Sequence, residues 1–370
     1  MAKREPGLTL PVVTVRGTHA DLGRAMGEAR AAQITRMAAT ALEALREQGT
    51  SEAELHEQVA PYVDAAGRVY PQLLVELQEM ARAADVPFDV LFRLNCYESR
   101  PPGTPARPPA ATLAITAKDP GVLPLANDPA AVPAAPNDGC TSVASRSERG
   151  VVVGHTEDSS PDAVEGLYLL DATVGAGPRF MCLNYAQTLP GCAAGVNEHG
   201  LVILIDALPD PDRRIGAPRH FVSRALLDLP TIDDVIDHLR HTERGGGWNY
   251  LVVQDRRIVN VEATATRLVT QEANPEGTLA HSNHYVDPTL AADAGDPRPN
   301  SVSRLARAME LVTTGMDVAQ MKRLLSDRQG EPDSICRERT IGAFIADTAA
   351  RRVSVCWGEP DEALWTTQPF

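Results

Sequence analysis

Apolar residues recur every three or four positions between about residue 12 and residue 99, which is the period of a helix with one buried face. The clearest stripe passes through Tyr70, Leu73, Leu74, Leu77 and Met80. Further stripes pass through Leu22, Met26 and Ala29, through Ile34, Met37, Ala41, Leu42 and Leu45, and, after Pro87, through Val90, Leu91 and Leu94. The pattern predicts a front segment made of several helices.

The periodicity stops between residues 101 and 136, where proline and alanine dominate the sequence. Such a composition is typical of a linker or an extended loop. A long irregular segment in a compact protein is usually functional or disordered. We therefore divide the chain into a helical segment (1–100), a Pro/Ala-rich linker (101–139) and a third region (140–370).

The third region contains short apolar runs separated by turn residues, a pattern that predicts β-strands. The runs lie at 151–153, 167–170, 201–205, 250–253, 258–261, 344–345 and 353–356. Helical patterns interrupt them after Thr231, after Ser301 and from Val318. This order indicates an α+β fold with packed layers of helix and sheet, without strict βαβ alternation.

Composition narrows the class of protein. The formal net charge is −14, which argues against nucleic acid as a partner because its backbone needs clustered Lys and Arg. No apolar run is long enough to cross a bilayer, and the start of the chain lacks the apolar core of a secretory signal. The six cysteines form no CxxC pair, so neither a disulfide framework nor a zinc knuckle is indicated. We expect a cytoplasmic protein with reduced thiols.

The hexapeptide 137–142 joins the linker to the third region and reads Asn-Asp-Gly-Cys-Thr-Ser. A small Gly139 before Cys140 suits a self-cleaving peptide bond, in which the thiolate attacks the carbonyl of Gly139. Cleavage would leave Cys140 with a free α-amine, which titrates near pH ~8 and can serve as its own base. The alternative is a hairpin turn at Asp138-Gly139, with Cys140 as a buried thiol.

Four motifs in order resemble the acyl-coenzyme A:6-aminopenicillanate acyltransferase family of N-terminal-nucleophile hydrolases. They are Gly-Cys-Thr-Ser at 139–142, Gly-His-Thr-Glu-Asp at 154–158, Gly-Val-Asn-Glu-His-Gly-Leu at 195–201 and His-Ser-Asn-His-Tyr at 281–285. The runs 183–191 and 219–227 are similar to the carcinine and β-alanyl-dopamine hydrolase branch. The resemblance implies a four-layer αββα sandwich with a helical N-terminal pro-segment.

The resemblance also implies roles for particular residues. The nucleophile maps to Cys140, the active-site acid to Asp158 and the oxyanion-hole amide to Asn283. Asp158 lies eighteen residues after Cys140, a distance that suits a hairpin; the alternative is a solvated acidic turn. A functional arginine maps to Arg337 or Arg339, with a surface cation as the alternative. Arg304 is a further candidate, which we expect to pair with acidic neighbours.

These roles predict cleavage at Gly139–Cys140 and an amidohydrolase that forms a thioester on Cys140. If an amine replaces water, the same site is an acyltransferase that can use acyl-CoA, and a third alternative is a non-catalytic scaffold. The expected partners are a small N-acyl amine and the chain's own pro-segment, with no cofactor, and a homo-oligomer is compatible with the sequence. A β-alanyl substrate carries an ammonium, for which Glu157 is the candidate carboxylate, unless Glu157 is merely solvated. His281 and His284 are spaced as HxxH, which without a third ligand is weak support for a metal.

Overall fold

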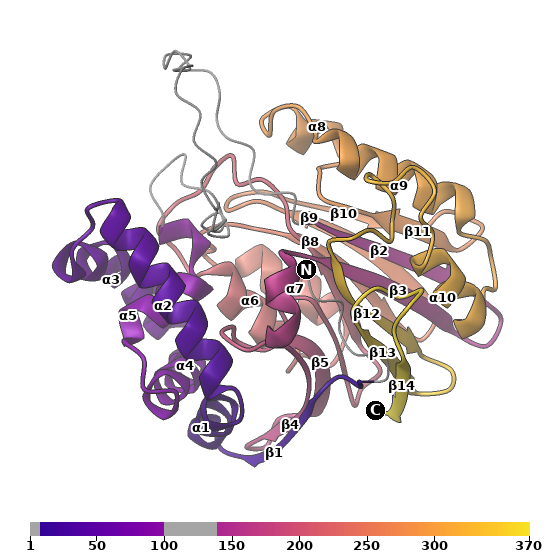
Figure 1. The fold of residues 1–370 in the computed structure, drawn as a ribbon. Coiled ribbons are helices and arrows are strands. Elements are labelled where there is room, and N and C mark those ends of the chain that lie inside the picture. Colours follow the sequence, from indigo (N-terminus) through magenta and orange to yellow (C-terminus); the bar gives the residue numbers. More distant parts are fainter. Residues whose placement is uncertain (1–7, 100–138) are drawn as a thin grey trace, which may run out of the picture.

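The computed structural model describes residues 8–99 and 139–370, which form two stacked β-sheets with helices on both outer sides (Figure 1). The large sheet orders its strands β1 (Val12–Gly17), β4 (Leu167–Val174), β5 (Arg179–Tyr185), β6 (Ala194–Asn197), β7 (Val202–Asp206), β8 (Asn249–Gln254), β9 (Arg257–Ala263) and β10 (Leu268–Glu272). The small sheet orders its strands β11 (Thr278–His281), β2 (Gly139–Arg146), β3 (Val151–Asp158), β12 (Thr340–Asp347), β13 (Arg352–Trp357) and β14 (Trp365–Pro369).

Helices cover the outer face of each sheet. The large sheet shares one core with α1 (His19–Ala29), α2 (Ala31–Glu47), α3 (Glu52–Val69), α4 (Pro71–Ala83), α5 (Phe88–Asn95), α6 (Arg219–Leu226) and α7 (Ile232–His241). The small sheet packs on α9 (Pro299–Leu311) and α10 (Val318–Leu325). The remaining helical pieces are η1 (Tyr97–Ser99), η2 (Pro161–Gly166) and α8 (Pro288–Ala291). None of the helices within 8–99 and 139–370 is long and apolar enough to pass through a membrane.

Strand β4 shows why the sheets stack in this way. Leu167 and Leu169 point into the core between the two sheets, whereas Tyr168 and Leu170 point into the core under the front helices. Successive side chains of a strand face opposite sides, so a strand that is apolar on both faces is buried from both sides. The predicted αββα sandwich is therefore confirmed.

The front segment is helical as predicted from α1 to α5, but the prediction of helix at its first residues is wrong. Val12–Gly17 forms β1, which pairs in parallel with β4, so that Val12 lies opposite Leu169. β-Branched residues favour strands, and Thr18 then begins α1 with a capping box to Asp21. The predicted linker lies outside the described residues except for Gly139.

All seven predicted strands are present in the third region, as β3, β4, β7, β8, β9, β12 and β13. The helix expected to open at Ser301 begins two residues earlier, at Pro299. The turn between β6 and β7 contains Gly200 with φ of +78°, a conformation that suits glycine. No disulfide joins any of the six cysteines, all of which lie in the described parts of the chain.

Candidate active site

The hairpin of β2 and β3 places the candidate nucleophile. The two strands are antiparallel, with Gly139 opposite Asp158 and Cys140 opposite Glu157. The expected return of the chain beside Cys140 is thus confirmed. Strand β2 is an internal strand between β11 and β3, so Cys140 lies at the start of a strand that is hydrogen-bonded on both sides.

Alternation along β2 sends neighbouring side chains to two different environments. Cys140 and Ser142 face the space between the sheets, on the same side as their partners Glu157 and His155. Thr141 faces α9, where its hydroxyl accepts a hydrogen bond from Arg304. The thiol and the backbone of Cys140 are therefore controlled by two separate groups of residues.

On the inner face the thiol of Cys140 contacts a buried carboxylate. The Sγ atom donates to Oε2 of Glu157 at 3.5 Å, and His155 Nε2 lies 2.8 Å from the same oxygen. Tyr185 donates its hydroxyl to Oε1 of Glu157 at 2.7 Å. Burial, and after it the charge of Glu157, raises the pKa of the Cys140 thiol well above its usual value. The thiol is therefore neutral at pH 7, and a base would have to remove its proton before it could act as a nucleophile.

On the outer face the backbone of Cys140 is held by an amide and a guanidinium. The Oδ1 atom of Asn283 accepts from the Cys140 N–H at 2.8 Å and from Arg304 Nη2 at 2.7 Å. Because two donors face Oδ1, the amide nitrogen of Asn283 points away, and it donates to the carbonyl of Ala207 at 3.0 Å. The predicted Asn283 thus lies against the candidate nucleophile Cys140, and in this chain it presents its oxygen to the Cys140 backbone.

Arg304 is completely buried and differs from our expectation. It donates to the carbonyl of Cys140, to Thr141 Oγ1 and to the Asn283 amide, so its hydrogen-bond partners near the site are neutral oxygens instead of the expected acidic neighbours. Its guanidinium also crowds Gly139, because a Cβ there would lie 2.6 Å from Arg304 Nη2 and 2.7 Å from Asn283 Oδ1. The residue before Cys140 must therefore be small.

Asp158 lies beside Cys140 in a buried ion pair with Arg337. The Nε and Nη2 atoms of Arg337 are both 2.9 Å from Oδ2 of Asp158, and Thr340 Oγ1 donates to Oδ1 at 2.6 Å. Arg339, the other predicted arginine, is half-buried, and its carbonyl accepts from the N–H of Ser159. The structure therefore brings Arg337 to the predicted acid, and Asp158 is not a solvated turn residue.

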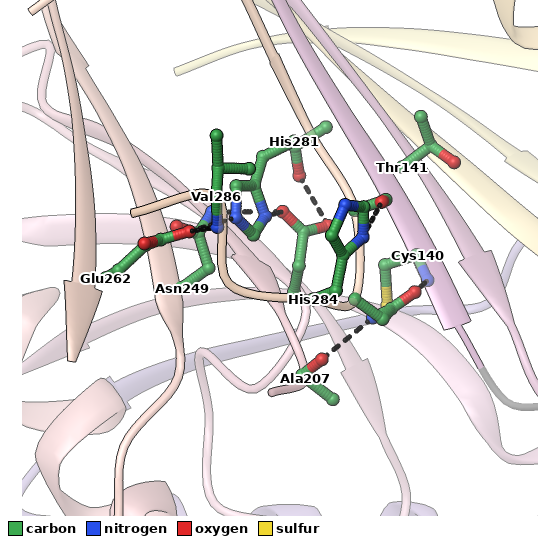
Figure 2. Close-up of polar contacts among 12 residues, drawn as sticks. Cys140, Thr141, Ala207, Asn249, Glu262, His281, His284 and Val286 are labelled. Atoms are coloured by element: carbon green, nitrogen blue, oxygen red, sulfur yellow. Dashed lines mark hydrogen bonds and ion pairs between the residues drawn. The ribbon is translucent and has the colours of Figure 1, made fainter. Parts of the chain in front are cut away.

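A row of polar side chains crosses the inner face of the small sheet. His281 on β11 lies opposite Ser142 on β2, and Ser142 lies opposite His155 on β3. The Ser142 hydroxyl donates to Asp206 at 3.0 Å, and Asp206 lies 3.2 Å from Nδ1 of His281. Glu262 lies 2.9 Å from Nε2 of His281, which points toward it in Figure 2.

These contacts place the His281 ring between the carboxylates of Asp206 and Glu262. Burial opposes its charge, but the bonds to Asp206 and Glu262 dominate and raise the pKa of His281 to about 9. Both of its ring nitrogens are bonded to carboxylates, whereas His284 bonds Ser301 at 2.7 Å, so the HxxH pair does not converge on one point. The atoms of Cys140, His155 and Glu157 that could bind a metal do lie close together, but each of them already takes part in the hydrogen bonds described above.

Sequence reasoning gave no role to four polar residues of this site, Ser142, His155, Tyr185 and Asp206. It named Arg304 as a candidate but did not predict its contact with the backbone of Cys140. Ser142 and His155 carried a usable signal, because polar residues at alternate positions of an apolar strand share one face. Tyr185 and Asp206 come from β5 and β7, and nothing in their local sequence predicted a contact with β2 or β3.

Comparisons with known proteins place this site in a family. The family model for acyl-coenzyme A:6-aminopenicillanic acid acyl-transferase matches residues 145–362, more than half of the chain, and this range includes Asp158, Asn283 and Arg337 and begins after Cys140. A β-alanyl-dopamine/carcinine hydrolase of Drosophila melanogaster is 26% identical over 95% of this chain and 94% of its own length.

Two solved structures are also similar in parts. Penicillin V acylase from Agrobacterium tumefaciens has 15% identity and a TM-score of 0.42 over 59% of this chain and 82% of its own. The C2A mutant of conjugated bile acid hydrolase from Clostridium perfringens has 10% identity and a TM-score of 0.37 over 62% of this chain and 97% of its own. From the extent of the family match, the chain belongs to the acyl-coenzyme A:6-aminopenicillanic acid acyl-transferase family.

Proposed function

We propose that the chain is an amidohydrolase with an N-terminal cysteine nucleophile, activated by self-cleavage between Gly139 and Cys140. The observation that carries the proposal is the position of Cys140 at the start of an internal strand, with its nitrogen held by Asn283 and its thiol beside Glu157. Cleavage would convert that nitrogen into a free α-amine without moving the strand. The result would be a fragment 1–139 and a catalytic fragment 140–370.

The chemistry of the cleaved enzyme follows from this geometry. The α-amine of Cys140 has an ordinary pKa near ~8 and takes the thiol proton as the sulfur attacks the substrate carbonyl. The α-amine then gives that proton to the amine part of the substrate, which leaves. A thioester remains on Cys140, and water hydrolyses it. A backbone N–H and the amide nitrogen of Asn283, once it releases the carbonyl of Ala207, would stabilise the oxyanion, a donor of this kind being worth roughly 3 kcal/mol. The carboxylate of Asp158, which is paired with Arg337, would position the new α-amine of Cys140.

The substrate that we propose is a small N-acyl amine. The Drosophila relative is named for β-alanyl-dopamine and carcinine, which supports an acyl group with an ammonium. Glu157 is the carboxylate nearest to the nucleophile, and it is 7% exposed, so it would meet such an ammonium in a poorly solvated place. Hydrolysis of β-alanyl amides should then fall more than that of neutral acyl amides in Glu157→Gln enzyme that has been cleaved. An equal loss for both substrates would end the charge-recognition role.

Acyl transfer is the second candidate, and the name of the matching family model favours it. The same thioester would pass its acyl group to an amine whenever that amine outcompetes water. Product analysis with an added amine acceptor distinguishes the two reactions, because transfer yields a new amide and hydrolysis yields a free acid.

The intact mass of freshly purified protein tests the central claim. Wild-type protein should show the masses of 1–139 and 140–370, whereas Cys140→Ala should remain whole. The two fragments should elute together, because the front helices share a core with the large sheet. A folded wild-type chain that stays whole would refute self-cleavage and an N-terminal amine as base.

We also propose a reducing, cytoplasmic location, which the absence of disulfides among the six described cysteines supports.

A further inference from the structure

Self-cleavage needs a base that the cleaved enzyme does not need. Before cleavage the nitrogen of Cys140 belongs to a peptide bond, so it carries no lone pair that can accept a proton. Its N–H is instead donated to Asn283 at 2.8 Å. The thiol is buried and its pKa is raised, so the neutral form dominates at pH 7. Another group must therefore remove the thiol proton in the uncleaved chain.

Glu157 is the carboxylate placed to do this. Its Oε2 atom accepts from the Cys140 thiol at 3.5 Å, and the two residues are direct partners across β2 and β3. Asp158 is the next carboxylate along β3, but it faces the other side of the sheet and is bonded to Arg337 and Thr340. Within the parts of the chain that the structure describes, no other acid or imidazole forms a hydrogen bond with the Cys140 sulfur.

The hydrogen bonds of His155 show how Glu157 is kept ready. The Ser142 hydroxyl donates its single proton to Asp206, so toward His155 Nδ1 it can only accept, which puts a proton on Nδ1. Nε2 of His155 faces Oε2 of Glu157 at 2.8 Å, and one proton must lie between these two atoms. When that proton is on Nε2, the pair is an imidazolium and a carboxylate, and Glu157 is free to accept from the thiol.

We propose that Glu157, oriented by His155 and Tyr185, is the general base of self-cleavage at the Gly139–Cys140 bond. This inference rests on the self-cleavage proposed above. The thiol proton moves to Glu157, and the sulfur attacks the carbonyl carbon of Gly139. The bond between that carbon and the Cys140 nitrogen breaks, and the proton held by Glu157 passes to the departing nitrogen. A thioester between Gly139 and the sulfur results, and water hydrolyses it to the Gly139 carboxylate, a free thiol and a free amine.

Two features make the assignment specific to the first step. The carboxylate is needed only while the α-amine does not yet exist, because afterwards the amine of Cys140 can take the proton. When Nε2 holds the shared proton, His155 would also stabilise the developing thiolate, since Nε2 and the thiol contact the same oxygen of Glu157. General base catalysis of this kind contributes roughly 100-fold to 10,000-fold in rate.

The test follows cleavage of the full chain in time, made by cell-free synthesis and sampled by intact mass. Glu157→Gln should slow cleavage at least ~100-fold, and Glu157→Asp, which keeps a carboxylate, should restore at least tenfold of that loss. Raising the pH should accelerate Glu157→Gln about tenfold per unit, because hydroxide then supplies the thiolate. Glu165→Gln is the matched control, since Glu165 is an exposed acid paired with Arg36, and its cleavage rate should equal that of wild type.

Two further measurements separate the base from a structural role. The first measurement compares the unfolding of the single variant Cys140→Ala with that of the double variant that also carries Glu157→Gln. Neither chain can cleave, so any difference in stability reports a structural role of Glu157. Hydroxylamine resolves thioesters, so it should not rescue Glu157→Gln if that variant fails before the thioester forms. Cleavage of Glu157→Gln at the wild-type rate, rescue by hydroxylamine, or slowing without any recovery at high pH would each overturn the inference. A wild-type chain that never cleaves would instead refute the proposed function on which it rests.

Discussion

Glu76 joins the front helices to the region after residue 139 through a fully buried ion pair with Arg224, and its loss should destabilise the protein strongly. Its two carboxylate oxygens accept from Nε of Arg224 at 3.1 Å and from Nη2 at 3.0 Å, and His19 Nδ1 lies 2.6 Å away. The side chains of Glu76 and Arg224 are both 0% exposed. The pair thus connects α4 to α6 at a place that water does not reach.

The magnitude follows from what remains after the change. Glu76→Gln keeps the shape but leaves the Arg224 guanidinium buried. Asp228, whose side chain is 35% exposed, is then its one ion-pair partner among residues 8–99 and 139–370. Removal of one partner of a buried ion pair costs about 3–5 kcal/mol, because an uncompensated charge stays in the interior. Since Asp228 compensates in part, we expect a loss of about 3 kcal/mol in the free energy of unfolding.

The assay is urea unfolding of a chain that also carries Cys140→Ala, so that no cleavage complicates the transition. Glu79→Gln on the same helix is the control, because Glu79 pairs with Arg82 and Arg24 at the surface and should lose less than about 1 kcal/mol. Glu76→Met combined with Arg224→Met should recover most of the stability, because no charge is then left buried. A loss below about 1 kcal/mol for Glu76→Gln, or a double variant as unstable as the single one, would refute the reasoning.

Three further outcomes are expected. Gly139→Ala should slow self-cleavage at least tenfold by intact mass, because its Cβ would lie 2.6 Å from Arg304 Nη2; cleavage at the wild-type rate would contradict the steric argument. The pKa of His281 is raised from 6.5 to about 9, so its contribution to stability is complete below pH 6.5 and is lost as the pH rises through about 9. In urea unfolding, His281→Gln should not show this decline in stability with pH. A decline equal to that of wild type would mean that another group causes it. Asp158→Asn removes the charge that holds Arg337 at 2.9 Å and should lower amide turnover per cleaved chain about 100-fold, and retention of turnover would exclude Asp158 from positioning.

The site could be predicted from the sequence wherever its residues lie close together along the chain. Cys140 and Asp158 belong to one hairpin, so their spacing already predicted that the two strands would return side by side. The same holds for the seven predicted strands and for the front helices, because the period of apolar positions reports which face is buried. The family resemblance pointed to Glu157, the neighbour of Asp158, as a carboxylate for the substrate, but it did not show that Glu157 contacts the thiol.

The rest of the site depends on elements that meet only in the folded molecule. Arg337 and Arg339 are two residues apart in an irregular segment, and only packing against β3 places the first of them on Asp158. Arg304 shows no special pattern in α9, yet that helix carries its guanidinium to the backbone of Cys140.

The same limit explains β1, whose six residues are too few for a clear period. It forms a strand because the edge of β4 offers partners for its backbone groups, an opportunity that arises only after the chain has folded. Local sequence therefore determined the front helices and the seven predicted strands, and which of their residues share a face, but it did not determine β1. Tertiary structure alone decided which charges meet, because a buried charge is stable only beside a partner that the fold supplies from elsewhere in the chain.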